Sequence, residues 1–572
     1  MAVLCLQVSV SAATLTWNTT NGNWTATNWL NGASAAAWNS ATPDSAVFGG
    51  SNAGAVVTVD APVTAGSVTF QNTGGTSFTS FGLKISGTAS NTVTLNGALT
   101  MNGTGYTVIS APITGTGSVV VNSGNLQLMS SSTVYNTYSG GTTLNGGTLG
   151  LSLGVSGSAS TGPLGTGTLT INGGTLAATT SGFAFSNAIV VGGNFTMAGG
   201  GVIKNAGTVD LGGAVRTITF TGATATNSNW TSTGVISNGG LNLVGDINNS
   251  TLEVVNLNAA NTYAGGTTID HVSAVLGTAN GVPNGGAVTI QNGGAVTLAS
   301  ASQTVGAFHL VGGTVSAQFA SRTLTATSFD VQSGTVGSLS SGSNVALAGT
   351  GAALTKTTSG TVTLNGTNTY TGATTISAGT LVVDGTLAAG SAVSLSGGTL
   401  AGAGTVNGLV TSTGAAGSTI SAGDSGSTTA LTLTLAGGLN AANGVGLSFT
   451  LGTNSTVLSL GSGVFTGSTA AGGLQLTFIN DGGLAANTIY TLATFGSSSG
   501  LDYTDLSAAV LPSGYALNTS FGTNGFLING TSLQVEFSAV AVPEPSTWLL
   551  SSLGFLPLFV LLRRRRSSVS LV

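Results

Sequence analysis

Polar and apolar residues alternate in short runs along this chain, and glycine or Asn-Gly bounds most of the runs. The clearest runs are residues 56–59, 93–95, 169–171, 288–290 and 362–364. Such alternation is typical of half-buried β-strands, and the bounding residues are typical of turns. Because Gly, Thr, Ser, Asn and Val are mediocre or poor helix formers, helices are not expected in the body of the chain. The pattern predicts an all-β protein.

One motif occurs three times along the chain. It reads Asn-Thr-Tyr-Ser-Gly-Gly-Thr-Thr-Leu at residues 136–144, and close copies occupy residues 261–269 and 368–376. A second shared element follows each copy, at residues 167–176, 286–296 and 391–400. Repeated short strands and turns are what a parallel β-solenoid requires, because each coil buries its inward residues against its neighbours. A string of β-sandwiches is the alternative, and the lack of regular domain-sized breaks disfavours it.

The motif, with its tyrosines Tyr138, Tyr263 and Tyr370, resembles the autotransporter-associated β-strand repeat. The resemblance extends roughly over residues 110–410. It implies the structural class of bacterial surface and secreted passengers and says almost nothing about activity. We therefore expect a right-handed parallel β-helix, or β-solenoid, over residues 51–424. At about 20 residues a coil and about 4.8 Å between coils, the rod would have roughly 19 coils and a length of about 90 Å.

Both ends of the repeat array differ from its middle. Residues 14–50 hold Trp17, Trp24, Trp29 and Trp38, and they resemble the leader that often opens proteins with these repeats. An N-terminal cap is expected here, because an open solenoid end is an aggregation-prone sheet edge. A sugar-stacking aromatic platform is the functional alternative.

Residues 425–540 are richer in aromatic residues and keep strand patterns such as residues 474–479 and 488–492. They predict a separate, smaller antiparallel β-domain of sandwich type.

The last segment, residues 541–572, has three parts in order. Val542, Pro543, Glu544 and Pro545 come first, an apolar run over residues 548–562 follows, and Arg563, Arg564, Arg565 and Arg566 come last. As a helix the run spans roughly 22 Å, short of the roughly 30 Å hydrocarbon core of a bilayer. The uncharged run, its interfacial Trp548 and the arginines nevertheless predict a transmembrane helix with a cytoplasmic basic end. A buried helix with a basic end is the alternative.

This order of parts resembles the PEP-CTERM sorting signal of Gram-negative bacteria. The resemblance implies that a membrane transpeptidase, exosortase, is a partner and cuts at or near Pro543, Glu544 and Pro545. It also implies a precursor tethered to the inner membrane and a mature form at the cell surface or outside the cell.

Residues 1–13 are apolar and small, and Ser11 and Ala13 suit a signal-peptidase site with cleavage after Ala13. A positive n-region is missing, so either the true start lies upstream or the segment is not a signal peptide. The single cysteine, Cys5, would leave with this segment, so the mature chain would have no disulfide and no thiolate metal site.

Charged residues make up 4% of the chain, far below the usual quarter. Apart from the terminal arginines, the basic residues are Lys84, Lys204, Lys356, Arg216 and Arg322, and they are scattered. Nucleic-acid binding needs a clustered cationic face, so that class is excluded.

Groups that could carry chemistry are sparse, and no catalytic residue, metal ligand or cofactor is predicted. His271 follows Asp270, but adjacent strand residues point to opposite faces, which is poor geometry for an acid–base pair. His309 is distant in sequence, and Asp502 and Asp505 are the closest carboxylates in a loop-like stretch. Eight further carboxylates are spread along the chain: Asp44, Asp60, Asp210, Asp246, Glu253, Asp330, Asp384 and Asp424.

The sequence thus favours a non-enzymatic, exported structural or adhesin-like protein that contacts extracellular polysaccharide. Two alternatives stay open: a polysaccharide lyase or hydrolase on a β-helix, and a non-catalytic carbohydrate-binding module.

Overall fold

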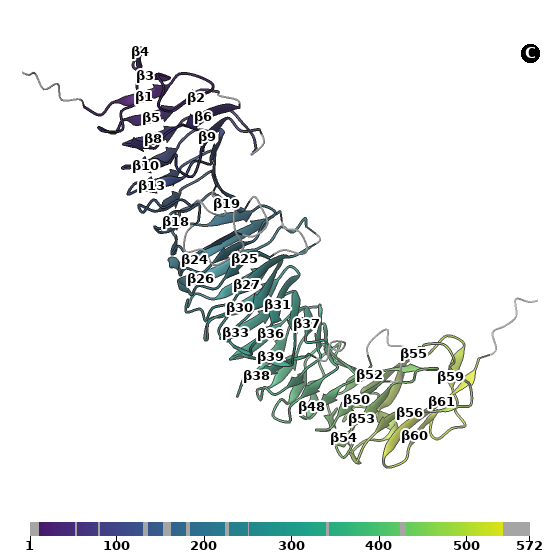
Figure 1. Cartoon of the computed structure of the whole chain (residues 1–572). Helices are drawn as coiled ribbons and strands as arrows, with labels where there is room; N and C mark the ends of the chain where they lie inside the picture. Colours follow the sequence, from purple (N-terminus) through teal and green to yellow (C-terminus); the bar gives the residue numbers. More distant parts are fainter. Residues whose placement is uncertain are drawn as a thin grey trace, which may run out of the picture.

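The protein is a right-handed parallel β-solenoid of about 17 turns. The computed structural model describes residues 11–51, 54–77, 80–129, 135–152, 162–178, 183–222, 228–249, 251–338, 343–423 and 431–540. Strands β1 (Thr14–Trp17) and β61 (Ser532–Ala539) lie at opposite ends of a long rod, and successive strands such as β30 (Val288–Gln291) and β33 (Ala307–Leu310) lie side by side along it (Figure 1). The expected β-solenoid is confirmed, and the string of β-sandwiches is excluded.

The first ladder of parallel strands runs along nearly the whole rod. Its strands are β1 (Thr14–Trp17), β5 (Ser45–Phe48), β8 (Ser67–Phe70), β11 (Leu99–Met101), β14 (Val119–Val121), β16 (Thr142–Leu144), β18 (Leu169–Ile171), β21 (Ile189–Val191), β24 (Val209–Thr221), β26 (Ile236–Val244), β28 (Thr267–Asp270), β30 (Val288–Gln291), β33 (Ala307–Leu310), β36 (Ser328–Val331), β39 (Leu354–Lys356), β42 (Thr374–Ile376), β45 (Val393–Leu395), β48 (Val410–Ser412), β51 (Leu439–Asn440), β54 (Val464–Thr466) and β57 (Ser497–Ser499).

A second face begins with one parallel ladder and continues with another. The first is β2 (Gly22–Asn23), β6 (Ala55–Val59), β9 (Leu83–Gly87), β12 (Tyr106–Ile109), β15 (Asn125–Met129), β17 (Thr148–Ser152), β19 (Thr175–Ala178) and β22 (Phe195–Ala198). The second is β20 (Phe183–Phe185), β23 (Ile203–Asn205), β25 (Ser228–Ser232), β27 (Glu253–Leu257), β29 (Val272–Leu276), β31 (Gly294–Leu298), β34 (Gly313–Ala317), β37 (Gly334–Val336), β40 (Thr361–Leu364), β43 (Thr380–Val383), β46 (Thr399–Gly402), β49 (Thr419–Ala422), β52 (Val445–Leu451), β55 (Leu474–Asn480) and β58 (Leu506–Val510).

Shorter sheets close the coils. They comprise β7 (Val63–Ala65), β10 (Val93–Leu95) and β13 (Ile113–Gly115); β32 (Gln303–Thr304), β35 (Arg322–Thr325) and β38 (Val345–Ala348); and β41 (Thr367–Asn368), β44 (Thr386–Leu387), β47 (Thr405–Val406), β50 (Thr432–Leu435), β53 (Val457–Ser459) and β56 (Ile489–Thr494). At the N-terminal end, β3 (Trp29–Asn31) pairs antiparallel with β1 and β4 (Ser34–Ala36).

Period-two alternation places one side of every strand inside the rod. In β52 buried and half-buried residues alternate over all seven positions, and in β16 buried Thr142 and Leu144 flank half-buried Thr143. The buried positions of successive coils pack into one continuous apolar core. Each coil is therefore stabilised by the coils on either side of it.

Coil length is not constant. Val93 pairs with Ile113 twenty residues on, whereas Val445 pairs with Leu474 twenty-nine residues on. The extra residues lie in the connections between strands, where they do not disturb the parallel register.

The expected separate antiparallel domain over residues 425–540 is wrong for most of that range. Strands β50 to β58, apart from β56, pair only in parallel and continue the coils. Antiparallel pairing is confined to β56, β59 (Tyr515–Leu517) and β60 (Phe526–Ile528), each of which pairs with β61 (Ser532–Ala539). Alternation has the same period in parallel and antiparallel strands, so the sequence pattern could not distinguish them.

Within the described ranges, the sole helix is the one-turn 3₁₀ helix η1 (Tyr503–Asp505). That part of the chain contains no helix of the length and apolar character needed to cross a membrane. The predicted transmembrane run over residues 548–562 lies outside the described residues and stays a prediction.

Candidate functional site

The repeat tyrosines lie inside the rod. Tyr138, Tyr263 and Tyr370 are at most 1% exposed, and each hydroxyl hydrogen-bonds the Oγ1 of the threonine four residues on, at 2.6, 2.7 and 2.7 Å. Burial raises the pKa of all three tyrosine hydroxyls. These side chains fill the core.

The repeat asparagines join neighbouring coils. Asn261 Oδ1 accepts a hydrogen bond from the Ile236 amide of the preceding coil at 2.8 Å, and its Nδ2 donates to the Gly281 carbonyl at 2.7 Å. Asn136 bonds the Ile113 amide and the Pro163 carbonyl in the same way, both at 2.8 Å.

In the third copy, Asn368 accepts from the Leu347 amide at 3.0 Å and donates to the Gly366 and Thr386 carbonyls at 3.0 and 3.2 Å. Each repeat asparagine thus satisfies backbone groups at a corner where the strand ladder is interrupted. The repeat motif is structural.

The N-terminal tryptophans form an aromatic cluster around Phe48. Trp17, Trp24 and Trp29 are at most 5% exposed and Trp38 is partly buried, with ring centroids 4.9–5.4 Å apart and ring planes 41–84° apart in their mutual contacts. A sugar-stacking platform needs exposed, coplanar rings. The alternative interpretation of these residues is therefore wrong, and the cluster occupies the position of the expected cap.

The surface of the first ladder presents one outward residue per coil. Most are half-buried hydroxyl residues: Thr69, Thr100, Thr143, Thr170, Thr268, Thr289, Thr355, Thr375, Ser394 and Thr411. The same column contains His309 and Asp330, whose Nδ1 and Oδ2 are 3.4 Å apart. Sequence reasoning missed this contact, although its spacing of one coil, 21 residues, is a usable signal.

An exposed ladder of amides runs along one corner. Asn122 donates to Asn102, Asn145 donates to Asn122, and Asn172 donates to Asn145, at 2.7–2.8 Å. The row presents side-chain amides at regular intervals along the rod.

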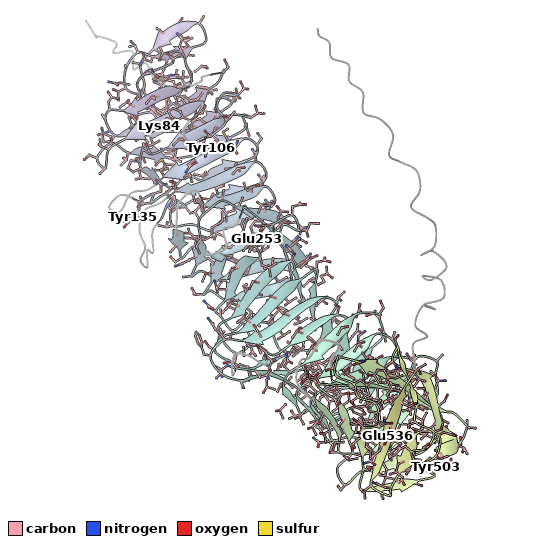
Figure 2. All side chains as sticks on the ribbon, turned by 90° about the vertical axis from the view of Figure 1, so that its right-hand side faces the viewer. Lys84, Tyr106, Tyr135, Glu253, Tyr503 and Glu536 are labelled. Atoms are coloured by element: carbon pink, nitrogen blue, oxygen red, sulfur yellow. The ribbon has the colours of Figure 1, made fainter. Side chains whose placement is uncertain are left out.

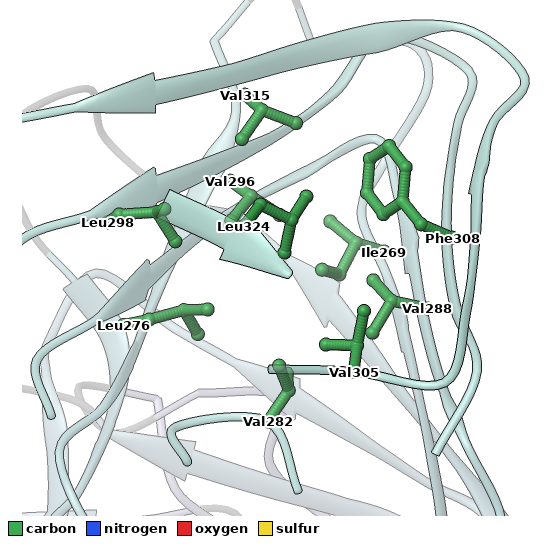
Figure 3. Close-up of a pocket in the computed structure, with 10 residues that line it drawn as sticks. All are labelled: Ile269, Leu276, Val282, Val288, Val296, Leu298, Val305, Phe308, Val315 and Leu324. Carbon is green, nitrogen blue, oxygen red and sulfur yellow. The ribbon is translucent and has the colours of Figure 1, made fainter. Parts of the chain in front are cut away.

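A surface hollow of about 460 Å³ lies beside the second repeat. Its lining is mostly polar or small: Asn261, Thr262, Tyr263, Ala264, Asn280, Pro283, Asn284, Gly285 and Gly286. By contrast, an interior void of about 10 Å³ is lined only by apolar side chains, including Ile269, Leu276 and Phe308 (Figure 3). A small apolar void of this kind stays dry and holds no polar ligand.

The charged side chains are spread along the rod and do not form one cluster. Lys84 lies toward the N-terminal end, Glu253 in the middle and Glu536 near the C-terminal end (Figure 2). No group of three or more His, Cys, Asp or Glu side chains suited to a metal occurs among the described residues. Asp424 lies outside them.

The two carboxylates nearest in sequence cap a helix. Asp502 accepts from the Thr504 amide at 2.7 Å, and Asp505 Oδ2 accepts from the Asp502 amide at 3.1 Å. Burial raises the pKa of Asp505, whereas hydrogen bonds from Thr504 lower that of Asp502. This is a capping box.

Asp270 and His271 do not form an acid–base pair. Asp270 accepts from the side chains of Gln291 and Asn292 at 2.8 and 2.7 Å. The His271 ring faces the backbone carbonyls of Asn249 and Asn292. The expectation that this pair is geometrically poor is confirmed, but His271 is not simply solvated.

Three segments of the chain, residues 132–151, 254–271 and 354–383, match the Passenger-associated-transport-repeat family. These three segments are similar to passenger-associated transport repeats. Each matched segment contains one of the tyrosines Tyr138, Tyr263 and Tyr370, so the expected resemblance to autotransporter-associated repeats is confirmed.

One relative is the adhesin BmaC autotransporter of Brucella suis biovar 1 (strain 1330), which is 31% identical over 209 residues. The match covers 36% of this chain and 5% of the adhesin. No solved structure matches the chain.

The predicted sorting residues, Val542 to Pro545 and Arg563 to Arg566, lie outside the described residues, and the PEP-CTERM resemblance stays a prediction. Ala13, the expected signal cleavage site, lies against the N-terminal edge of the rod. Its amide donates to Asp44 Oδ1 at 2.8 Å, and its carbonyl accepts from the Ser45 amide.

Proposed function

We propose that this protein is an exported, adhesin-like surface protein that contacts neutral extracellular polysaccharide through the outside of its solenoid. The proposal rests on the difference between the inward and the outward side chains of the coils. The repeat asparagines and tyrosines are buried, while the outward column consists mostly of hydroxyl side chains. The similarity to an autotransporter adhesin supports a place at the cell surface.

An uncharged array of hydroxyls and amides suits hydrogen bonding to sugar hydroxyls. Each such bond in water is worth only about 0.5–1.5 kcal/mol, so one contact would bind weakly. A polymer that lies along several coils makes many contacts at once, and linked contacts strengthen one another. The hollow beside Asn261 and Asn284 is the concave part of this surface where we place the tightest contact.

The proposal contains no catalytic step. A glycosidase needs two carboxylates about 5–10 Å apart across a sugar, and a lyase likewise needs reactive groups in a cleft. Asp502 and Asp505 have their oxygens engaged in a helix cap, and His309 and Asp330 stand in an open column of hydroxyl residues.

Binding should be insensitive to salt. We expect the purified protein to co-sediment with an insoluble neutral glucan equally well at 50 mM and 500 mM NaCl, because few charges are available for screening. The double variant Thr262→Val/Asn284→Ala should bind about two- to tenfold more weakly, since it removes two polar groups from the hollow.

The matched control is Asn145→Ala, which removes an exposed amide outside the hollow and should weaken binding less than the double variant does. Unchanged binding by the double variant would reject the hollow as a contact. Failure to bind any neutral polysaccharide, or loss of binding in salt, would reject the proposed function.

We also propose that exosortase processes the C-terminal tail, on the basis of the motif Pro543-Glu544-Pro545. Replacing these three residues with alanine should leave a full-length, membrane-bound form in cells that carry the processing enzyme. Intact-mass analysis after fractionation measures this. Pro512→Ala, a proline in the described part of the chain, is the control, and an unchanged processed mass in the triple variant would exclude the sorting role.

A further inference from the structure

His271 bridges three successive coils. It follows β28 in the left-handed backbone region, with a φ of 53°. Its Nε2 is 3.0 Å from the Asn249 carbonyl, in the turn after β26 of the preceding coil. Its Nδ1 is 2.9 Å from the Asn292 carbonyl, in the turn after β30 of the next coil.

Both partners of the ring are acceptors. A backbone carbonyl cannot donate a hydrogen, so both contacts are hydrogen bonds only when both ring nitrogens carry protons. A neutral imidazole would keep one of the two bonds and direct a lone pair at the other carbonyl oxygen. The geometry at His271 therefore selects the imidazolium form.

The charged groups around the ring favour the same form. Glu253 at the start of β27 is fully buried beside the turn that contains Asp246 and Asn249, and its carboxylate acts on His271 as a nearby negative charge. Asp270 is adjacent to His271 in sequence, and Asp246 lies in the turn that contains Asn249, where it bonds the Asn248 amide at 2.9 Å. No cationic side chain other than His271 is found among the residues of these turns.

The turn approaches His271 closely. The Gly245 amide donates to the Asp270 carbonyl at 2.8 Å. A Cβ atom at position 245 would lie 2.1 Å from the His271 carbonyl oxygen and 2.6 Å from a Glu253 carboxylate oxygen. Glycine is therefore required at this position, and the turn packs directly against the backbone of His271.

We propose that His271 is a proton-dependent clamp that holds the turn of residues 245–249 against the solenoid in acid and loosens it as the pH rises. The turn carries Ile247, which is 70% exposed. The clamp thus controls the mobility of an apolar side chain that projects from the middle of the rod.

The direction of this pH dependence follows from the pKa shifts of two groups, His271 and Glu253. The carbonyls of Asn249 and Asn292, and then Glu253 and Asp270, raise the pKa of His271 above its usual value. Burial raises the pKa of Glu253. For both groups the folded form binds the proton more tightly than the unfolded chain does. Their contribution is complete below the unfolded pKa values and is lost as the pH rises through the folded ones.

The test uses the fact that the chain has two histidines. In the full-length protein labelled at histidine Cε1, NMR should show two histidine signals, and the one absent from His271→Asn belongs to His271. Asparagine accepts the left-handed backbone and does not titrate, so this variant keeps the fold. We expect His271 to titrate above about 6.5.

Hydrogen exchange gives the second readout. After correction for the intrinsic rate, protection of the Gly245 and Asn249 amides should fall about two- to tenfold between pH 5.5 and pH 8.5, the effect of one lost hydrogen bond. The same amides in His271→Asn should show a weaker dependence, because the contribution of His271 is gone and only that of Glu253 remains.

Glu253→Gln should lower the pKa of His271. Protection of the Gly245 and Asn249 amides should still depend on pH in this variant. A His271 that titrates at or below 6.5 in the unmodified protein, or protection of the turn that does not change with pH, would overturn the proposal. Neither outcome bears on polysaccharide binding, which is measured separately.

Discussion

Replacing Asn261 with alanine is expected to destabilise the surrounding coils by about 2–4 kcal/mol. The side chain is 4% exposed and satisfies the Ile236 amide and the Gly281 carbonyl. Alanine leaves both backbone groups buried without partners, and each such group costs about 1–3 kcal/mol. Water that enters the vacated space recovers part of this cost.

Native-state hydrogen exchange is the suitable measurement, because long repeat arrays open locally rather than in one transition. The Ile236 amide should lose protection by about 30- to 1000-fold, the equivalent of the free-energy loss. Asn145→Ala is the control, since its amide bonds lie on the exposed ladder and surface changes cost about 0.5 kcal/mol or less. Equal effects of the two substitutions would show that the repeat asparagine does not join the coils.

The strands themselves could be predicted from the sequence. Residues 93–95 and 169–171 form β10 and β18, and residues 56–59, 288–290 and 362–364 lie within β6, β30 and β40. In most of these short runs inward apolar residues alternate with outward polar ones, and glycine or asparagine lies at one end. Local pattern and tertiary burial agree here, so propensity alone is a sufficient guide.

The direction of pairing could not be predicted from that pattern. Aromatic residues after residue 425 suggested a new domain, yet Phe449 and Phe478 occupy the same position in adjacent parallel coils. Phe465 and Phe495 also meet inside the rod, with ring centroids 5.8 Å apart. These aromatic side chains are buried inside the last coils of the rod rather than in a separate domain.

The repeat motif marked the right residues without showing which way they face. Tyr263 and Asn261 recur because the inside of a corner needs them, whereas a repeated sequence could equally line an outer surface. His271 meets Asn249 and Asn292 at spacings of 22 and 21 residues, one coil away in each direction. Its partners there are backbone carbonyls, which every residue has, so the sequence pattern does not mark them.

Replacing Trp29 with alanine is expected to open the N-terminal end of the rod, at a cost of about 3–5 kcal/mol. Trp29 is fully buried, its ring contacts Trp17, Trp24 and Trp38, and its Nε1 donates to the Trp24 carbonyl at 2.7 Å. It also begins β3, the strand that folds back antiparallel on β1. Loss of the ring removes the packing that holds this strand in place.

An uncovered edge of parallel strands pairs readily with another chain. The variant should therefore associate at concentrations where the unmodified protein does not, and light scattering after size-exclusion chromatography measures the mass. Near-ultraviolet circular dichroism follows the loss of fixed tryptophan packing in the same samples. Trp38→Ala is the matched control, because Trp38 is only partly buried, and its removal should leave β3 paired and the mass unchanged. If Trp29→Ala keeps the original mass and the tryptophan signal of the remaining rings, the cluster does not cap the solenoid, and the edge must be protected by the residues that precede β1.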